Sequence, residues 1–230
     1  FEGQMGVMVG SDKLRVRLGR DERSVMQEHT VAEGASTGVL ESYKAFRCAM
    51  DLHAARHFTA AASVDGSLKE DVTKHGRVRR RAAFGVWEGA MPGHDGSAAA
   101  VAGMWGGRLP SDWEIADCET YAILAYLKNV IDRSPDPSRE RVLVLSDCAS
   151  ALQAIEKVWR ECSTRACKTK ERGAMLETIC GMRARLGHVS LMWIPAHRGS
   201  SVSAYADALA KAYLGATDLA DVETIVIPFV

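Results

Sequence analysis

The stretch Arg141-Val-Leu-Val-Leu-Ser-Asp-Cys-Ala-Ser-Ala-Leu-Gln153 decides the fold. Its first part is a nearly continuous apolar run, which is typical of a buried strand, and its second part begins a helical pattern. Asp147 stands at the junction between the two. Strands that lead directly into helices build sheets that helices cover. The stretch therefore predicts an α/β domain with a carboxylate at the end of one strand.

The sequence on both sides continues this pattern in a defined order. The predicted strands cover residues 58–64, 81–87, 98–105, 141–146 and 188–194, and the predicted helices cover residues 112–131, 149–162, 171–186 and 201–214. A polar turn at 69–76 and a Gly/Pro-rich loop at 88–97 separate the first three strands, which favours an antiparallel meander. The order β-β-β-α-β-α-α-β-α predicts an α/β fold: a five-stranded mixed sheet with helices on both faces.

The first 58 residues differ from this pattern and are predicted to form an N-terminal extension. Two short runs at 5–10 and 14–18 predict a β-hairpin, and residues 40–58 show a helical pattern. An isolated hairpin is only marginally stable, so this one is expected to lean on another part of the protein. The predicted organisation is an extension over 1–58, an α/β domain over 59–216 and a C-terminal tail over 217–230.

The composition limits the classes of function. The 230 residues are 47% apolar, which is enough for a core, and suit one domain with an appendage. The 29 basic and 29 acidic residues balance, which argues against binding nucleic acid by bulk charge alone but leaves room for local basic patches. No apolar run reaches the ~18 residues that a membrane span needs, and the N-terminus has no secretory apolar segment. We therefore predict no membrane partner.

The cysteines predict a location rather than a chemistry. The chain has six, at positions 48, 118, 148, 162, 167 and 180, without a C-x-x-C pair or a zinc-type spacing. Scattered thiols are typical of a reducing, intracellular compartment, and nucleus, cytoplasm and mitochondrion are equally compatible with them. Cys118 and Cys148 adjoin candidate acids, but neighbouring side chains on a helix or strand point in different directions, so we interpret both as packing residues.

Four acids are predicted to point inward from separate elements, and one histidine lies near the last of them. Asp65 ends the first strand of the meander, Glu119 lies on the first helix, and Asp207 lies on the last helix, ten positions after His197; Asp147 completes the set. If these side chains converge, they form a cage of oxygen ligands without a thiolate. Such a cage suits Mg²⁺ and the hydrolysis of phosphodiesters.

Each of these residues also has an ordinary structural explanation. The Asp65-Gly pair favours a turn, and Asp147 could cap the helix that follows it. Glu119 could be a solvated helix acid, Asp207 a surface residue and His197 an ordinary loop imidazole. The case for a shared site depends on finding all five in one ordered set.

Five motifs carry a resemblance to a known family. They are Ser63-Val-Asp-Gly-Ser, Asp117-Cys-Glu-Thr-Tyr-Ala-Ile-Leu, Leu145-Ser-Asp-Cys-Ala-Ser-Ala-Leu, Trp193-Ile-Pro-Ala-His-Arg-Gly and Ala206-Asp-Ala-Leu-Ala-Lys. In this order and spacing they resemble type 1 ribonuclease H, and especially the ribonuclease H domains of non-LTR retrotransposons. The resemblance covers about residues 60–215 and leaves the extension unexplained.

The resemblance implies a ribonuclease H-like fold and a two-metal endoribonuclease that cuts the RNA strand of RNA/DNA hybrids. Asp65, Glu119, Asp147 and Asp207 would hold two Mg²⁺ ions about 4 Å apart, with Mn²⁺ as a substitute. Asp65 would bridge both ions, Glu119 and Asp147 would complete the first site, and Asp207 would complete the second. His197 would move a proton or assist product release.

Two basic stretches are candidates for binding the phosphates of an RNA/DNA hybrid or a structured RNA. The first comprises Lys74, Arg77, Arg79, Arg80 and Arg81, and the second, which stands where the family has a basic protrusion, includes Trp159, Arg160, Lys168 and Lys170. The second could equally be a solvated loop between helices, and the first could contact a partner protein or ribosomal RNA.

Three departures from the family pattern lie where the hybrid would be held. Val202-Ser-Ala replaces Gly-Asn-Glu, Glu114-Ile-Ala-Asp replaces an asparagine-bearing approach to the helix glutamate, and Leu68-Lys-Glu-Asp replaces a glycine-rich turn. These changes remove substrate contacts but no metal ligand. They keep a second hypothesis open, that of a domesticated domain serving as a structural or RNA-binding subunit of a larger ribonucleoprotein. A fragment of a retroelement polyprotein is a third.

Overall fold

The protein is represented by a computed structural model. It describes residues 7–10 and 13–16 as strands, and residues 57–72, 74–90, 100–165, 167–194 and 201–215 more fully. Within the domain the elements follow the predicted order.

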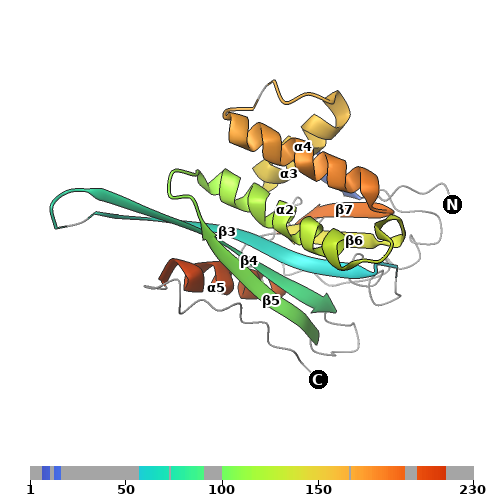
Figure 1. Ribbon diagram of the computed structural model, residues 1–230, viewed down its shortest axis with the longest axis horizontal. Coiled ribbons are helices and arrows are strands. Elements are labelled where there is room, and N and C mark those ends of the chain that lie inside the picture. Colours follow the sequence, from blue (N-terminus) through green and yellow to red (C-terminus); the bar gives the residue numbers. More distant parts are fainter. Residues whose placement is uncertain are drawn as a thin grey trace.

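A five-stranded mixed sheet forms the centre of the domain (Figure 1). Its strands are β3 (Ala60–Val72), β4 (Val78–Ala90), β5 (Ala100–Leu109), β6 (Arg141–Ser146) and β7 (His188–Trp193). In space they follow the order β5-β4-β3-β6-β7, in which β3, β4 and β5 are antiparallel and β6 and β7 run parallel to β3. The predicted five-stranded mixed sheet is confirmed.

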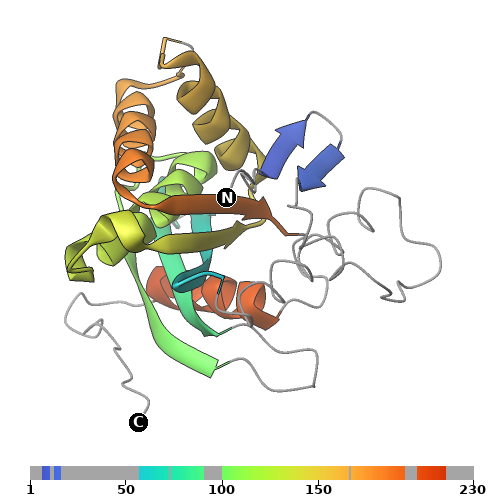
Figure 2. The ribbon, with the colours of Figure 1, turned by 90° about the vertical axis from the view of Figure 1, so that its right-hand side faces the viewer.

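Helices cover both faces of this sheet. They are α2 (Ile115–Arg133), α3 (Ala149–Glu161), α4 (Lys170–Arg185) and α5 (Ser201–Gly215), with a short 3₁₀ helix at Pro137–Arg139. Figures 1 and 2 show α2, α3 and α4 on one face and α5 on the other. Among the described residues, no helix is both long and apolar enough to cross a membrane.

Two apolar layers hold the helices on the sheet. The larger lies under α2, α3 and α4, where Ile123, Val144 and Ile155 are fully buried. The smaller lies under α5, where Tyr213 and Leu214 pack against Ala83 of β4. Because side chains alternate across a strand, β4 serves both layers: Phe84 and Val86 belong to the larger layer, and Ala83 belongs to the smaller one.

The hairpin of β3 and β4 is longer than the sequence predicts. The two strands pair without a break from Ala62 opposite Glu88 to Val72 opposite Val78. Asp65 therefore lies inside a strand rather than at its end, and the predicted turn at 69–76 is confined to a tight bend around Gly76, whose φ is +70°. The polar residues of this segment favour a turn locally, but cross-strand ion pairs such as Arg81 with Asp71 stabilise the ladder instead.

Other boundaries also move. The loop predicted at 88–97 begins later, because β4 continues to Ala90. The rest of the predicted loop lies outside the described residues. The N-terminal hairpin is present as β1 (Val7–Gly10) and β2 (Lys13–Val16). The predicted helix at 40–58 falls outside the described residues except for His57 and Phe58, which are not helical, and the predicted tail at 217–230 is also outside them.

Candidate metal centre

Three of the four predicted acids meet at one point of the sheet. The parallel pairing of β3 with β6 ends at Ser63 opposite Leu145, and Asp65 and Asp147 each follow two residues later. Glu119 reaches the same point from the first turns of α2. One carboxylate oxygen from each acid lies within 4.8 Å of the others. These three acids are called the acid cage below.

A glycine lets α2 approach the sheet closely enough to form this cage. A Cβ atom at Gly66 would lie only 2.5 Å from the backbone nitrogen of Glu119 and 2.7 Å from the carbonyl carbon of Cys118. Any larger residue would push α2 away from β3. The Gly66 N–H also donates a hydrogen bond to the Glu119 carboxylate, which lowers the pKa of that group and holds it in place.

Burial and mutual repulsion disfavour the ionised form of the acids in the cage. Asp65 is 8% exposed and Glu119 5% exposed. Burial, and then the charges of Asp147 and Asp207, raise the pKa of Asp65 to about 7. Burial, and then Asp65 and Asp147, raise the pKa of Glu119 to about 9, and its Oε2 is buried without a hydrogen-bond partner. A bound cation would relieve both costs, so these residues fit a divalent metal.

The fourth acid, Asp207, lies beside the cage on α5, the helix that covers the face of the sheet opposite α2. Helix α5 crosses β4 at Gly85, where a Cβ atom would lie 2.3 Å from the carbonyl oxygen of Ala206. Gly85 is the partner of Asp65 in the β3–β4 ladder, which brings Asp207 near Asp65. The Asp207 carboxylate is 24% exposed and accepts a hydrogen bond from Lys211 Nζ at 2.7 Å. Its charge acts on the cage, but its oxygens are not part of the three-acid cluster.

The segment that follows β7 was predicted to supply His197, and residues 195–200 lie outside the described ones. The strand itself contributes an anchor: Trp193 Nε1 donates a hydrogen bond of 2.8 Å to the backbone carbonyl of Asp147. The alternative explanation of Asp147 as a helix cap is wrong, since Cys148 holds the N-cap position of α3 and no side chain caps it. The Asp147 carboxylate therefore reaches the cage from the end of strand β6.

The two cysteines beside the acids act as packing residues, as predicted. Cys118 is fully buried, and burial together with the neighbouring carboxylates raises the pKa of its thiol to about 12. Burial also raises the pKa of Cys148, whose sulfur contacts the Ser150 hydroxyl at 3.3 Å. Neither thiol forms a thiolate readily, which leaves oxygen as the ligand atom of the site.

The first predicted basic stretch lies on the β3–β4 hairpin and beside the end of α5. Lys74, Arg77, Arg79 and Arg80 are exposed. Arg81 is half-buried, and it donates hydrogen bonds to the Leu214 carbonyl and to Asp71. Four of these five residues are thus open to solvent, while Arg81 holds two elements together.

The second predicted basic stretch runs along the end of α3 and the start of α4. Trp159 is 41% exposed, and the guanidinium of Arg183 lies 4.6 Å from the centre of its ring. Arg160 and Lys170 are exposed. Lys168 is already engaged by an ion pair with Glu114 at 2.6 Å. This stretch therefore contains both solvated residues and residues that tie α4 to its neighbours.

Some residues that shape the site were not predicted. Gly66 and Gly85 allow a helix to approach the sheet closely. The only sign of this in the sequence is a glycine beside an acid or inside a strand. Arg172 pairs with Asp117 at 2.7 Å and fixes the start of α4 to the start of α2, next to Glu119. No local pattern indicates this pair, because the two residues are far apart in the sequence.

Comparisons with known proteins bear on the fold. No family model and no curated protein sequence matches the chain. The solution structure of the ribonuclease H domain of prototype foamy virus is 15% identical and superimposes with a TM-score of 0.54, covering 69% of this chain and 95% of that domain. A foamy viral protease-reverse transcriptase in complex with an RNA/DNA hybrid is 11% identical, with a TM-score of 0.51 over 81% of this chain and 22% of that one.

Ribonuclease H1 from the archaeon Halobacterium salinarum is 17% identical, with a TM-score of 0.47 over 68% of this chain and 97% of that one. The similarity to the foamy-virus domain shows that this chain has a ribonuclease H fold, as the five motifs predict. The chain matches only about a fifth of the length of the viral protease-reverse transcriptase. The resemblance to retrotransposon domains stays a prediction.

Proposed function

We propose that this chain, a ribonuclease H fold with an acid cage at its centre, is a metal-dependent endonuclease that hydrolyses the RNA strand of RNA/DNA hybrids. The observation that carries the proposal is the convergence of Asp65, Glu119 and Asp147 to within 4.8 Å. Carboxylates packed so closely in a protein interior need a cation, and hard oxygen ligands select ions such as Mg²⁺.

In this proposal the acids hold two Mg²⁺ ions, for which Mn²⁺ can substitute. Asp65, Glu119 and Asp147 would hold one ion, and Asp65 together with Asp207 would hold the other. When bound, the ions supply an activated water and stabilise the leaving oxygen of the phosphodiester. Lys211 occupies an oxygen of Asp207 and would have to release it when the second position fills.

The other residues of the chain orient and protect this chemistry. The Gly66 N–H holds the Glu119 carboxylate, and Trp193 holds the backbone at Asp147. Burial of Asp65 and Glu119 excludes bulk water, which strengthens electrostatic interactions at the cage. His197 is proposed to accept or pass on a proton during turnover or to assist product release, because its ordinary pKa suits that task.

An RNA/DNA hybrid is the substrate that the similarities support best. One foamy viral protease-reverse transcriptase of the same fold is described in complex with an RNA/DNA hybrid, and another in complex with double-stranded DNA. A protein tells RNA from DNA through the 2′-hydroxyl in the wide minor groove of an A-form duplex. We propose that the two basic stretches contact the phosphates of such a duplex. We also propose an intracellular, reducing location for the protein.

A second candidate function is a non-catalytic subunit of a larger ribonucleoprotein. It is favoured by the surroundings of Glu114 at the start of α2. Glu114 forms an ion pair with Lys168, so this position offers a nucleic acid no uncharged hydrogen-bond partner. It is also favoured by Leu68–Asp71, which continue strand β3 where the family has a glycine-rich turn. This candidate requires stable co-purification with a large particle.

The proposed activity is tested with labelled RNA/DNA hybrid, duplex DNA and duplex RNA, each with Mg²⁺, with Mn²⁺ and with a chelator. The wild-type protein is compared with Asp147→Asn and with Asp132→Asn, a matched change at an exposed acid of α2. We expect loss of the hybrid's RNA strand only with metal, and only in the wild type and Asp132→Asn. The proposal fails if no hybrid is cut with either metal while the protein is folded, and co-sedimentation with a ribonucleoprotein would then support the second candidate.

A further inference from the structure

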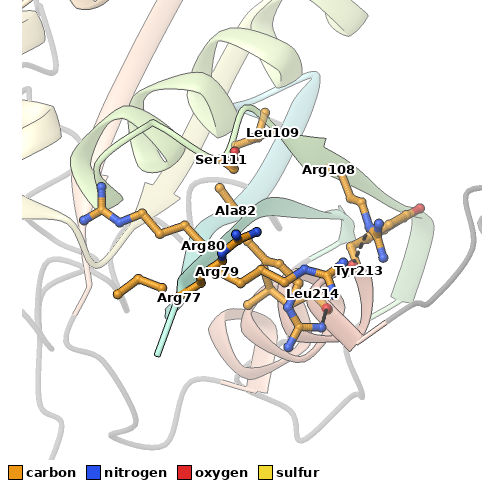
Figure 3. A pocket seen from close by; sticks show the side chains of 11 residues that line it. Arg77, Arg79, Arg80, Ala82, Arg108, Leu109, Ser111, Tyr213 and Leu214 are labelled. Atoms are coloured by element: carbon orange, nitrogen blue, oxygen red, sulfur yellow. Dashed lines mark hydrogen bonds between the residues drawn. The ribbon is translucent and has the colours of Figure 1, made fainter. Parts of the chain in front are cut away.

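A pocket rich in arginine lies beside the end of α5 (Figure 3), and none of the three acids of the cage lines it. Its volume is about 570 Å³, and its walls come from the start of β4, the end of β5 and the last residues of α5. Its charged side chains are all arginines: Arg77, Arg79, Arg80, Arg81 and Arg108. We call it the arginine pocket.

The acids nearest this pocket offset only part of its charge. Glu70 on β3 pairs with Arg80, and Asp71 pairs with both Arg81 and Lys69. Asp71 also stands opposite Arg79 in the ladder, where its oxygens are already shared. No acid is among the described residues that line the pocket. The arginines thus outnumber the carboxylates that can neutralise them, and the pocket favours an anion.

The walls of the pocket are fixed by the fold before any ligand binds. Arg81 donates a hydrogen bond of 2.5 Å to the carbonyl of Leu214, and Arg108 donates one of 3.2 Å to the carbonyl of Tyr213 (Figure 3). These carbonyls belong to the last turn of α5, which otherwise lacks donors. Because these two arginines are already ordered, little side-chain entropy remains to be lost when an anion enters.

The position of the pocket relates it to the acid cage. Arg81 lies four residues along β4 from Gly85, the partner of Asp65, which is about 13 Å at the usual rise of a strand. Leu214 lies seven residues along α5 from Asp207, which is about 10 Å at the usual rise of a helix. Both estimates place the arginine pocket roughly 10 to 13 Å from the residues beside the acid cage.

We propose that the arginine pocket receives the backbone phosphates of the nucleic-acid duplex whose scissile bond lies at the acid cage. The proposal rests on the proposed function, which supplies the duplex. A strand of double-stranded DNA advances about 3.4 Å per nucleotide along the duplex axis, and a strand of an A-form duplex advances less, so the pocket contacts phosphates roughly three to five nucleotides from the cleavage point. Guanidinium groups suit this role because they bind phosphate oxygens in a forked geometry and keep their charge.

Within the pocket the arginines divide into two roles. Arg81 and Arg108 are positioning residues, since they hold the end of α5. Arg79 and Arg80 are exposed on opposite faces of β4. Arg79 is open to solvent, and Arg80 shares only a half-exposed ion pair with Glu70, which it can exchange for a phosphate at the mouth of the pocket. Arg80 also lies near the start of α2, where Lys168 first, and then Arg172 and Arg80, lower the pKa of Glu114. The contact surface therefore extends from α5 toward α2.

The test uses the double variant Arg79→Gln/Arg80→Gln, which removes two charges and keeps an uncharged polar side chain at both positions. Its control is Arg139→Gln/Arg185→Gln: both residues are exposed, and Arg139 stands before the start of β6, at the opposite end of that strand from Asp147. Binding of a labelled hybrid is measured without divalent metal over a range of salt concentrations. We expect about tenfold weaker binding for the pocket variant at low salt and a salt slope shallower by about 1.8, with the control at the wild-type values.

A second measurement checks the spacing. Hybrids are shortened in steps on either side of the cleavage point, and we expect wild-type affinity to fall once fewer than about four base pairs remain on one side, with no such step in the pocket variant. Equal salt slopes for the pocket and control variants would overturn the proposal. So would saturation of the pocket by inorganic phosphate without effect on hybrid binding, which would indicate a small-anion site.

These outcomes are separable from those of the proposed function. If hybrid binding depends on the pocket but no metal supports cleavage, the proposed activity fails and the pocket stands. If cleavage occurs and the pocket variant binds and cuts as the wild type does, the pocket fails and the activity stands. Thermal unfolding of both variants shows whether either change has affected the fold.

Discussion

The acid cage and the arginine pocket present opposite unbalanced charges on one sheet, and they are built in different ways. The cage gathers three carboxylates from β3, α2 and the end of β6 into a buried point, where a raised pKa marks the cost of their proximity. The pocket gathers five guanidinium groups at the surface around the end of α5, four of them from two adjacent strands and one, Arg77, from the residue before β4. The first favours a cation and the second favours an anion.

The difference between them shows how electrostatic cost scales with burial. Inside the cage each like charge raises the pKa of its neighbours, because little water remains to screen it. At the pocket the arginines are solvated, and Glu70 and Asp71 neutralise part of their charge. Changes at the cage should therefore have large effects on chemistry and stability, and changes at the pocket should have small effects that depend on salt.

The largest effect is expected at the centre of the cage. Glu119→Gln should lower metal-dependent hydrolysis of the hybrid by about a thousandfold or more, since it removes a ligand charge from a buried site. Asp207→Asn should cost clearly less, because Asp207 is partly exposed and shares its charge with Lys211. Single-turnover rates at saturating Mg²⁺ measure both. Equal losses would contradict the contrast in burial and place Asp207 fully inside the cage.

The next effect concerns the approach of α2 to β3. Gly66→Ala should destabilise the protein by roughly 1–3 kcal/mol, because the added carbon would overlap the backbone of Glu119 and Cys118. The matched control is Gly103→Ala on β5, where the added carbon meets nothing within 4 Å. Urea unfolding measures the difference. If Gly66→Ala were no more destabilising than Gly103→Ala, close packing of α2 would not be what assembles the cage.

A smaller effect should appear as a dependence of stability on pH without metal. Asp65 and Glu119 have raised pKa values, about 7 and about 9, so the folded protein binds more protons than the unfolded chain above about pH 4. Stability from these groups is present at low pH and is lost as pH rises toward those values. Mg²⁺ should restore it, and most strongly at high pH.

Thermal unfolding in chelator and in Mg²⁺, from about pH 5 to pH 9, measures this dependence. Glu119→Gln should flatten the curve in chelator and reduce the gain from Mg²⁺. Glu140 serves as an internal reference, because hydrogen bonds from Ser134 and Thr59 lower its pKa. Its contribution to the stability of the fold is therefore lost only as pH falls below the ordinary pKa range of a glutamate. If stability in chelator instead rose with pH across the whole interval, the raised pKa values of the cage acids would be contradicted.

The sequence is sufficient to predict the order of the elements and the acids of the cage, because each acid ends or lies on an element whose periodicity is clear. Asp147 after an apolar strand is the plainest case. The length of β3 and β4 is not predictable in this way, since Glu70 and Asp71 resemble a turn until their arginine partners on β4 are known. Local polarity favoured a turn, and cross-strand pairing overrode it.

The same limit applies to the two sites. The pairing of Asp207 with Lys211 follows from helical spacing, but the place of α5 over Gly85 depends on the packed sheet. For the pocket, the sequence shows the run of arginines on β4. It does not show that Arg108 joins them from β5 or that Arg81 is used to hold α5, because both facts depend on strand register.

The smallest expected effect is at the acids that border the pocket. Arg80 donates a hydrogen bond to Glu70, and both side chains are about half exposed, so the pair adds little stability. Glu70→Gln leaves Arg80 uncompensated and should tighten hybrid binding by about two- to fivefold at low salt, with a steeper salt dependence and an unchanged melting temperature. Asp132→Asn, which removes an equally exposed acid from α2, should leave binding unchanged. A tightening in both variants would mean that net charge alone governs affinity. A tightening in Glu70→Gln only would mean that the charge acts where the duplex passes, since screening limits the reach of an exposed charge to about 10 Å at ordinary salt.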